Sequence, residues 1–145
     1  MRVDYSLRPE NLLEHTHSRS DVVIHNKRTY LLEMPSVTPF DVAQIEAFIA
    51  AHKANVVAMV HHKTCSGMLN PLAEICALAK KNGALFVVDG ISSVGATAID
   101  MEACHIAFVS SSSSKVIGSY SGLSFVIGRK KHFKRLKDTR VKRPM

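Results

Sequence analysis

Short apolar runs alternate with segments of helical periodicity along most of this chain, and that alternation restricts the possible folds more than any other feature. Predominantly apolar stretches, each short enough for a strand, occur at residues 22–24, 30–32, 55–60, 84–88, 106–109 and 123–127. Strands that are apolar on both faces are typical of a sheet covered by helices on both sides. The sequence therefore predicts an α/β fold with a mostly parallel sheet and helices on both faces.

Two helices are predicted between these runs. Thr38-Pro39-Phe40-Asp41 has the composition of a helix start, with a capping hydroxyl, a proline in the first turn and an acid three positions on. Apolar residues then recur at helical spacing as far as Ile49. Asn70-Pro71 is expected to begin the second helix, and Asn82-Gly83 is expected to end it.

The length of 145 residues suits a single domain, and 46% of the residues are apolar. We expect residues 1–20 to be irregular, residues 21–137 to form the domain, and residues 138–145 to be a basic tail. No apolar stretch approaches the roughly 18 residues of a membrane helix, and the N-terminus lacks the apolar core of a secretory signal. Three cysteines without CxxC spacing favour a reducing compartment. These features predict a cytoplasmic protein without a membrane partner.

The net charge of +7 comes from the C-terminal end. Residues 129–145 hold nine Lys or Arg and one Asp, a local charge of +8, so the other 128 residues sum to −1 (7 − 8). Within this stretch, residues 130–137 are predicted to be helical, with Phe133 and Leu136 facing inward. Nucleic-acid binding across the whole surface is therefore not predicted, although a tail that binds polyanions remains an alternative.

Polar segments follow three of the predicted strands, at residues 61–67, 89–95 and 110–115. In a parallel sheet ligands bind at the carboxyl ends of the strands, so we expect these segments to meet. Asp89 and Lys115 bring a carboxylate and an amine, the two groups that an enzyme needs to hold and tune pyridoxal phosphate. Each also has a simpler interpretation, because an Asp at a strand end often only forms a turn and most lysines are solvated.

Histidines are the main candidates for a metal site. His61 and His62 are adjacent, and adjacent side chains on an extended segment point to opposite faces, which makes a poor chelate. His15 and His17 share a face, but no carboxylate or cysteine at suitable spacing completes a set. Cys65 lies in a candidate ligand loop, where an incidental cysteine is more common than a reactive one. No metal site is predicted.

Three motifs carry a family resemblance: Gly-Met-Leu-Asn-Pro at 67–71, Val-Asp-x-x-Ser-Ser at 88–93, and the segment at 113–126 that runs from Ser-x-Lys to Gly-x-x-Phe-Val. With them, residues 56–133 resemble the class V pyridoxal-phosphate-dependent aminotransferases, and among these the 2-aminoethylphosphonate–pyruvate transaminases. The resemblance extends weakly back to Asp21. It implies an incomplete large domain of the fold-type I pyridoxal-phosphate transferases.

The resemblance also implies roles for five residues. Lys115 would carry the cofactor and shuttle a proton between the amine-bearing carbon of the substrate and the C4′ atom of the cofactor. Asp89 would pair with the pyridinium nitrogen, and Ile91 would pack against one face of the ring. Thr64 falls where the family places a hydroxyl near the ring, and Ser114 where relatives usually have Asn or Gln in contact with the phosphate.

The chain departs from the family pattern in three ways. The usual His-x-Glu-Thr-Thr-Thr-Gly loop reads HHKTCSG, so Lys63 stands in place of a glutamate, and Ser114 is shorter than the usual amide. Full members are also far longer. The part before the match normally supplies a glycine-rich phosphate cup, and the part after it supplies a small domain with an arginine for the substrate carboxylate. The family site is shared across a homodimer.

These observations predict a transaminase that moves an amino group from 2-aminoethylphosphonate, or a similar small amine, to pyruvate, present here as a truncated or fragmentary chain. One alternative is a non-catalytic remnant of that enzyme that keeps the sheet. Another is a small α/β module that binds polyanions through its basic C-terminal tail.

Overall fold

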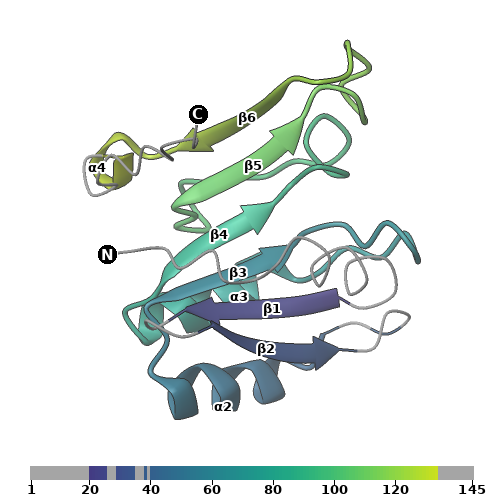
Figure 1. Cartoon of the computed structure of the whole chain (residues 1–145). Coiled ribbons are helices and arrows are strands. Elements are labelled where there is room, and N and C mark those ends of the chain that lie inside the picture. The colour runs from purple at the N-terminus through teal and green to yellow at the C-terminus, as the bar shows by residue number, and fades with distance from the viewer. Residues whose placement is uncertain (1–19, 26–28, 35–37, 39, 134–145) are drawn as a thin grey trace, which may run out of the picture.

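A computed structural model of the chain describes residues 20–25, 29–34, 38 and 40–133 (Figure 1). The expected irregular N-terminal segment, apart from Ser20, and the expected basic tail lie outside the described residues. The elements are β1 (Ser20–His25), β2 (Thr29–Met34), α2 (Val42–His52), β3 (Val56–Val60), α3 (Leu72–Lys81), β4 (Leu85–Asp89), β5 (Phe108–Ser112), β6 (Ser124–Gly128) and α4 (Lys130–Phe133).

The strands form one sheet with the order β2-β1-β3-β4-β5-β6 (Figure 1). β3, β4 and β5 are parallel, as their apolar runs predict. β1 and β2 form an antiparallel hairpin, β1 is also antiparallel to β3, and β6 is antiparallel to β5. The parallel strands are therefore neighbours, and their carboxyl ends lie at the same edge of the sheet.

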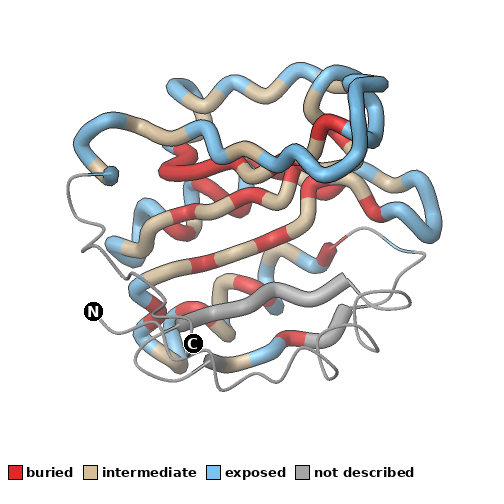
Figure 2. The backbone as a smooth tube through the Cα atoms, turned by 45° about the horizontal axis from the view of Figure 1, so that its top comes forward, coloured by how far each residue is buried: buried red, intermediate tan, exposed pale blue. Residues whose placement is uncertain are grey.

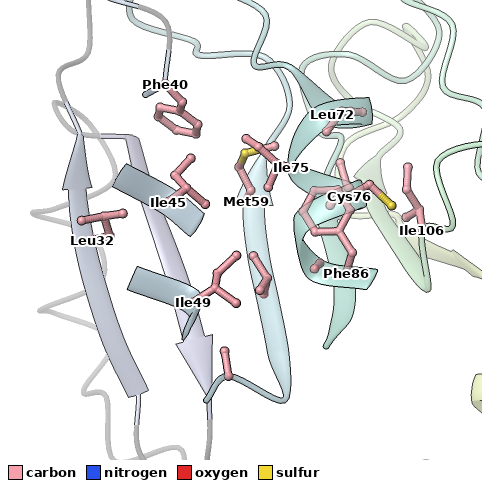
Figure 3. Close-up of a cluster of buried hydrophobic side chains, with 14 of the residues drawn as sticks. Leu32, Phe40, Ile45, Ile49, Met59, Leu72, Ile75, Cys76, Phe86 and Ile106 are labelled. Carbon is pink, nitrogen blue, oxygen red and sulfur yellow. The ribbon is translucent and has the colours of Figure 1, made fainter. Parts of the chain in front are cut away.

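Alternate side chains of the central strands face different environments. Val57, Met59, Phe86 and Val88 are between 0% and 2% exposed and pack with α2 and α3 in one hydrophobic core (Figure 3). Figure 2 shows this buried band through the middle strands and the mostly exposed β6 at the rim. The sequence predicts helices on both faces; among the described residues the two long helices lie on this one, which we call the covered face.

The other face of the same strands, which we call the open face, is also apolar but only partly buried. It carries the residues that alternate with the core positions: Val56, Ala58, Val60, Leu85 and Val87. Asp89 continues this row at the carboxyl end of β4. Asp89 therefore belongs to the open face at the edge of the sheet where a ligand is expected.

The start of α2 differs from the sequence-based prediction. The helix begins at Val42, and its cap is the Asp41 carboxylate, which accepts hydrogen bonds from the amides of Ala43 and Gln44 at 2.9 and 3.2 Å. The capping hydroxyl expected of Thr38 was therefore wrong. An aspartate is an equally good cap and stands directly before the helix.

Two further boundaries shift. α3 has no side-chain cap, because its N-cap position is occupied by Pro71. The side-chain amide of Asn70 donates to the carbonyl of Val60 at 2.7 Å. β5 starts two residues later than predicted and continues through Ser112, so three of the five serines belong to the sheet rather than to a loop. Pairing of all three serines with β6, and of Ser110 also with β4, overrides their low strand propensity.

The described part of the basic helix, α4, is a single turn, and residues 134–137 of the prediction lie outside the described residues. Phe133 was expected to face inward. It is 43% exposed, and its ring packs edge-on against Phe108 with 5.1 Å between the centroids. Among the described residues, no helix combines the length and the apolar character needed to cross a bilayer.

Candidate active site

Three polar loops meet at the carboxyl edge of the parallel strands (Figure 1). The registers place Val60 beside Asp89, and Asp89 beside Ser110, so the strand ends are level. Two backbone hydrogen bonds join the edge: the amide of His61 donates to the carbonyl of Asp89 at 2.9 Å, and that of Gly90 donates to the carbonyl of Ser110 at 2.8 Å. The loops after β3, β4 and β5 therefore leave the sheet side by side, as the sequence predicts.

One carboxylate oxygen of Asp89 forms a turn, and the other is available to a ligand. Its Oδ1 atom accepts a hydrogen bond from the amide of Ile91 at 2.9 Å, which is the turn-forming role expected of a strand-end aspartate. The carboxylate is half-buried on the open face. Its other oxygen has no hydrogen-bond partner among the described residues. A fixed carboxylate with one oxygen available suits a ligand that presents an N–H group.

Thr64 lies against the loop that carries Ile91. The Thr64 hydroxyl is 3.1 Å from the hydroxyl of Ser92, and Nδ1 of His62 is 3.0 Å from the carbonyl oxygen of Ser92. The residue before Ser92 is Ile91, whose amide donates to the Asp89 carboxylate, so Thr64, Ile91 and Asp89 are held in one cluster. Sequence reasoning missed Ser92 and His62 as the residues that make this connection.

Lys63, which stands in place of the usual glutamate, does not face this cluster. Its side chain is only 2% exposed, its ammonium donates to the carbonyl of Thr38 at 2.8 Å, and it lies 4.4 Å from the centroid of the Phe40 ring. Burial lowers the pKa of Lys63. The positive charge that Lys63 brings in place of a glutamate therefore lies near the start of α2, where a carbonyl and an aromatic face stabilise it.

His61 also belongs to the frame of the site. It is 5% exposed, and its Nδ1 atom has no hydrogen-bond partner among the described residues. Burial, and secondarily the neighbouring His62, lowers the pKa of His61, so the ring is held neutral. His62 is more exposed and points to Ser92, so the two rings diverge as expected of adjacent residues. Over the described ranges, no three His, Cys, Asp or Glu side chains are grouped so that they could hold a metal.

The serine run divides into two sets. Ser111 and Ser113 are buried, and their hydroxyls donate to backbone carbonyls, Ser111 to Gly90 at 3.4 Å and Ser113 to Leu123 at 3.2 Å. Ser112 and Ser114 alternate with them, and their hydroxyls lie 3.0 Å apart. Ser114 is exposed. One set fixes the loop and the other presents a pair of hydroxyls, which is suitable for an anionic group.

Lys115 follows the second set at the start of an exposed turn. The amide of Gly118 donates to its carbonyl at 3.0 Å, and the amide of Ser119 donates to the carbonyl of Ser113 at 2.9 Å. No ion pair joins the Lys115 amine to Asp89 among the described residues. The structure therefore brings both residues to one edge of the sheet, on the loops of neighbouring strands, without direct contact between them.

Solved structures with the same arrangement include aminotransferases. The ureidoglycine–glyoxylate aminotransferase of Bacillus subtilis superposes with a TM-score of 0.66 at 27% identity, covering 71% of this chain and 27% of that protein. The pyridoxamine–pyruvate aminotransferase of Mesorhizobium loti gives the same TM-score at 28% identity, covering 75% of this chain and 28% of that one. The expected fold, part of the large domain of a fold-type I pyridoxal-phosphate transferase, is confirmed.

Sequence comparison identifies the family. The family model described as aminotransferase class-V matches residues 23–142. The 2-aminoethylphosphonate–pyruvate transaminases of Aeromonas hydrophila and Salmonella paratyphi B are 40% and 42% identical over 104 and 90 residues. These matches cover 71% and 61% of this chain but 27% and 24% of the relatives, so the chain spans about a quarter of their length. The chain belongs to the class V aminotransferase family.

Proposed function

We propose that this chain provides the cofactor-binding edge of a pyridoxal-phosphate-dependent transaminase. The amino donor is 2-aminoethylphosphonate or a similar small amine, and the acceptor is pyruvate. The support comes from the family membership, from relatives that carry this activity in their names, and from the meeting of Asp89 and the Lys115 loop at one edge of the sheet. A cytoplasmic homodimer is the assembly we propose for the active enzyme.

The groups at this edge fit the cofactor. The available oxygen of Asp89 could accept a hydrogen bond from a pyridinium N–H, and the Ser112 and Ser114 hydroxyls could donate to a phosphate. Thr64 is held beside the turn that begins at Asp89, where its hydroxyl would contact a ring bound to that carboxylate. When bound, pyridoxal phosphate supplies an electron sink for the substrate's amine-bearing carbon.

In this proposal the residues of the chain bind, orient and move protons. The carboxylate of Asp89 keeps the pyridinium nitrogen protonated, and the Ile91 side chain packs on a ring face. The Nζ atom of Lys115 would hold the cofactor and would move a proton from the amine-bearing carbon of the substrate to the C4′ atom of the cofactor. Ser114 orients the phosphate through its hydroxyl.

A trapping experiment tests the proposal. The purified chain is incubated with pyridoxal phosphate, reduced with borohydride and digested, and the modified lysine is mapped by mass spectrometry. We expect modification at Lys115, and its loss in Lys115→Ala but not in Lys130→Ala, since Lys130 is equally exposed. Asp89→Asn should weaken the affinity for the cofactor roughly 10- to 100-fold, the effect of losing a charged hydrogen bond.

The same experiment separates the proposal from its alternatives. Modification spread over many lysines, unchanged by Lys115→Ala, would favour the non-catalytic remnant, for which the short span of the chain relative to its relatives is the supporting observation. Production of alanine from pyruvate and 2-aminoethylphosphonate then tests turnover. The module that binds polyanions through the basic tail predicts retention on heparin and no specific modification.

A further inference from the structure

A second polar site lies at the opposite edge of the sheet. A surface pocket of about 270 Å³ is formed where α3 ends, where β4 begins and where β6 ends. These are the amino ends of the parallel strands, so the pocket is separated from Asp89 by the length of β4. Five of its lining residues can carry positive charge: Lys80, His105, Arg129, Lys131 and His132. No carboxylate is among the described residues that line it.

Arg129 is held in the pocket by its neighbours and keeps an unused donor. Its Nη2 atom donates to the carbonyls of Met101 and Glu102, both at 2.9 Å. The side chain is 17% exposed, whereas the Glu102 carboxylate, 3.2 Å away, is 88% exposed and compensates the charge weakly. The Nε atom is buried without a hydrogen-bond partner among the described residues. A buried charged donor without a hydrogen-bond partner is costly, and Arg129 brings its positive charge to the lining of the pocket.

Lys80 and His105 form a second fixed pair in the lining. The Lys80 ammonium is 2.8 Å from Nε2 of His105, and because an ammonium only donates, Nε2 accepts this hydrogen bond. His105 has a positive φ of 50°, in a turn that the Asp100 carboxylate fixes by accepting the amides of Glu102 and Ala103. The position of His105 is therefore set by this turn, and the hydrogen bond between His105 and Lys80 fixes the lysine beside it.

The floor of the pocket is apolar and does not compete for an anion. It includes Phe86 and Cys76, each 2% exposed. Burial raises the pKa of the Cys76 thiol to about 11, with a further contribution from Cys104, while Arg129 and Lys80 lower it. The thiol is therefore neutral at physiological pH, and the walls supply the charge. A low-dielectric floor strengthens the attraction between these cations and a bound anion.

We propose that this pocket binds a small phosphate-bearing anion, independently of the cofactor site. Arginine and lysine together are the side chains that recognise phosphate oxygens. The volume is just below the roughly 300–1,000 Å³ of pockets for drug-sized ligands, so it suits inorganic phosphate or a small phosphorylated or phosphonate compound. A simpler role for Lys80 is to balance the helix dipole at the end of α3. Lys81 would serve that role equally, but Lys81 pairs with Glu46 and does not line the pocket.

Phosphate titration with matched variants tests the proposal. Inorganic phosphate is titrated into the full isotope-labelled chain, and the backbone amides are followed by NMR. We expect saturable shifts at Gly83, Ala84, His105 and Arg129. Lys80→Gln should weaken binding roughly 10- to 100-fold, Lys80→Arg should retain it, and Lys81→Gln, which removes the same charge one position along α3, should leave it unchanged.

A second variant protects the test against misfolding. His105→Asn removes the ring but keeps a residue type that tolerates positive φ, and it should weaken phosphate binding as Lys80→Gln does. Equal losses in Lys80→Gln and Lys81→Gln would overturn the proposal in favour of general charge attraction. Shifts confined to Ser112–Lys115 would overturn it too, because phosphate would then be read at the cofactor edge. Neither result bears on Lys115 trapping, so the two proposals fail separately.

Discussion

The covered and open faces of the central strands carry polar residues with different roles. On the covered face and its continuation, His61 and Ser111 are 5% and 2% exposed, and Lys63 is 2% exposed. On the open face, Asp89 and Ser112 are only half-buried. The alternation of side chains along a strand thus divides adjacent polar residues into two groups: a buried frame (His61, Lys63 and Ser111) and a presented surface (Asp89 and Ser112) that is accessible to a ligand. We use "strand parity" for the face of the sheet to which a residue's side chain points. At this site, strand parity distinguishes structural residues from candidate ligands better than residue type does.

The largest expected effect is on the free energy of unfolding, when apolar residues of the two faces are truncated. Phe86→Ala, on the covered face, should lower the free energy of unfolding by about 3–5 kcal/mol, because it leaves a cavity beneath the helices. Val87→Ala, the next residue but on the open face, should cost less than about 1.5 kcal/mol, because its side chain is only partly buried. Urea denaturation measures both. Equal costs would show that the open face is as deeply buried in solution as the covered one.

The next effect concerns Gly90, which directly follows Asp89. A Cβ atom at this position would lie 2.7 Å from Cγ2 of Val94, 2.9 Å from Cγ1 of Val109 and 3.3 Å from the carbonyl oxygen of Ser110. Gly90→Ala should therefore destabilise the chain by about 1–3 kcal/mol through overpacking. In a Val94→Ala background the penalty should shrink, since the nearest obstacle is gone. A penalty of the same size in both backgrounds, measured by thermal unfolding, would argue against this packing.

A smaller effect is the pH dependence of stability that the buried residue His61 should produce. The pKa of His61 is lowered in the folded state, so between that pKa and the ordinary value of about 6.5 the unfolded chain binds more protons. Stability should therefore fall as pH drops from 6.5 toward the folded pKa, and the cost is complete below it. His61→Gln should flatten this part of the stability profile. Profiles of the same slope for both proteins, from urea denaturation at several pH values, would contradict a buried neutral ring.

The sequence predicts the parallel strands and the edge where their loops meet, because both depend on local apolar runs and on a general property of parallel sheets. It places Asp89 and Thr64 in loops that do converge. It does not predict that β5 extends through Ser112, since serine has a low strand propensity and the end of this strand is ordered by pairing with β6, which is distant in the predicted helix and strand pattern. Nor does it predict the direction of Lys63, which is set by the distant Phe40.

The smallest effect is also the sharpest test of the comparison, because it uses neighbouring residues of one type. Ser111→Ala, on the covered side, removes a buried hydroxyl that donates to the carbonyl of Gly90, and should cost about 0.5–1.5 kcal/mol of stability. It should leave the affinity for pyridoxal phosphate unchanged. Ser112→Ala, on the open face, should do the reverse: stability stays within about 0.5 kcal/mol of the parent while the affinity falls.

Both readouts are needed for each serine variant, denaturation for stability and borohydride trapping at increasing cofactor concentration for affinity. The crossed pattern follows because the Ser111 hydroxyl is buried and donates to the carbonyl of Gly90. The Ser112 hydroxyl makes only a long contact of 3.5 Å to the carbonyl of Leu123 and lies 3.0 Å from the hydroxyl of Ser114, at the edge proposed for the phosphate. If Ser111→Ala weakened cofactor binding as much as Ser112→Ala did, the buried frame and the presented surface would act as one unit. Strand parity would then no longer distinguish ligand contacts from structural ones at this site.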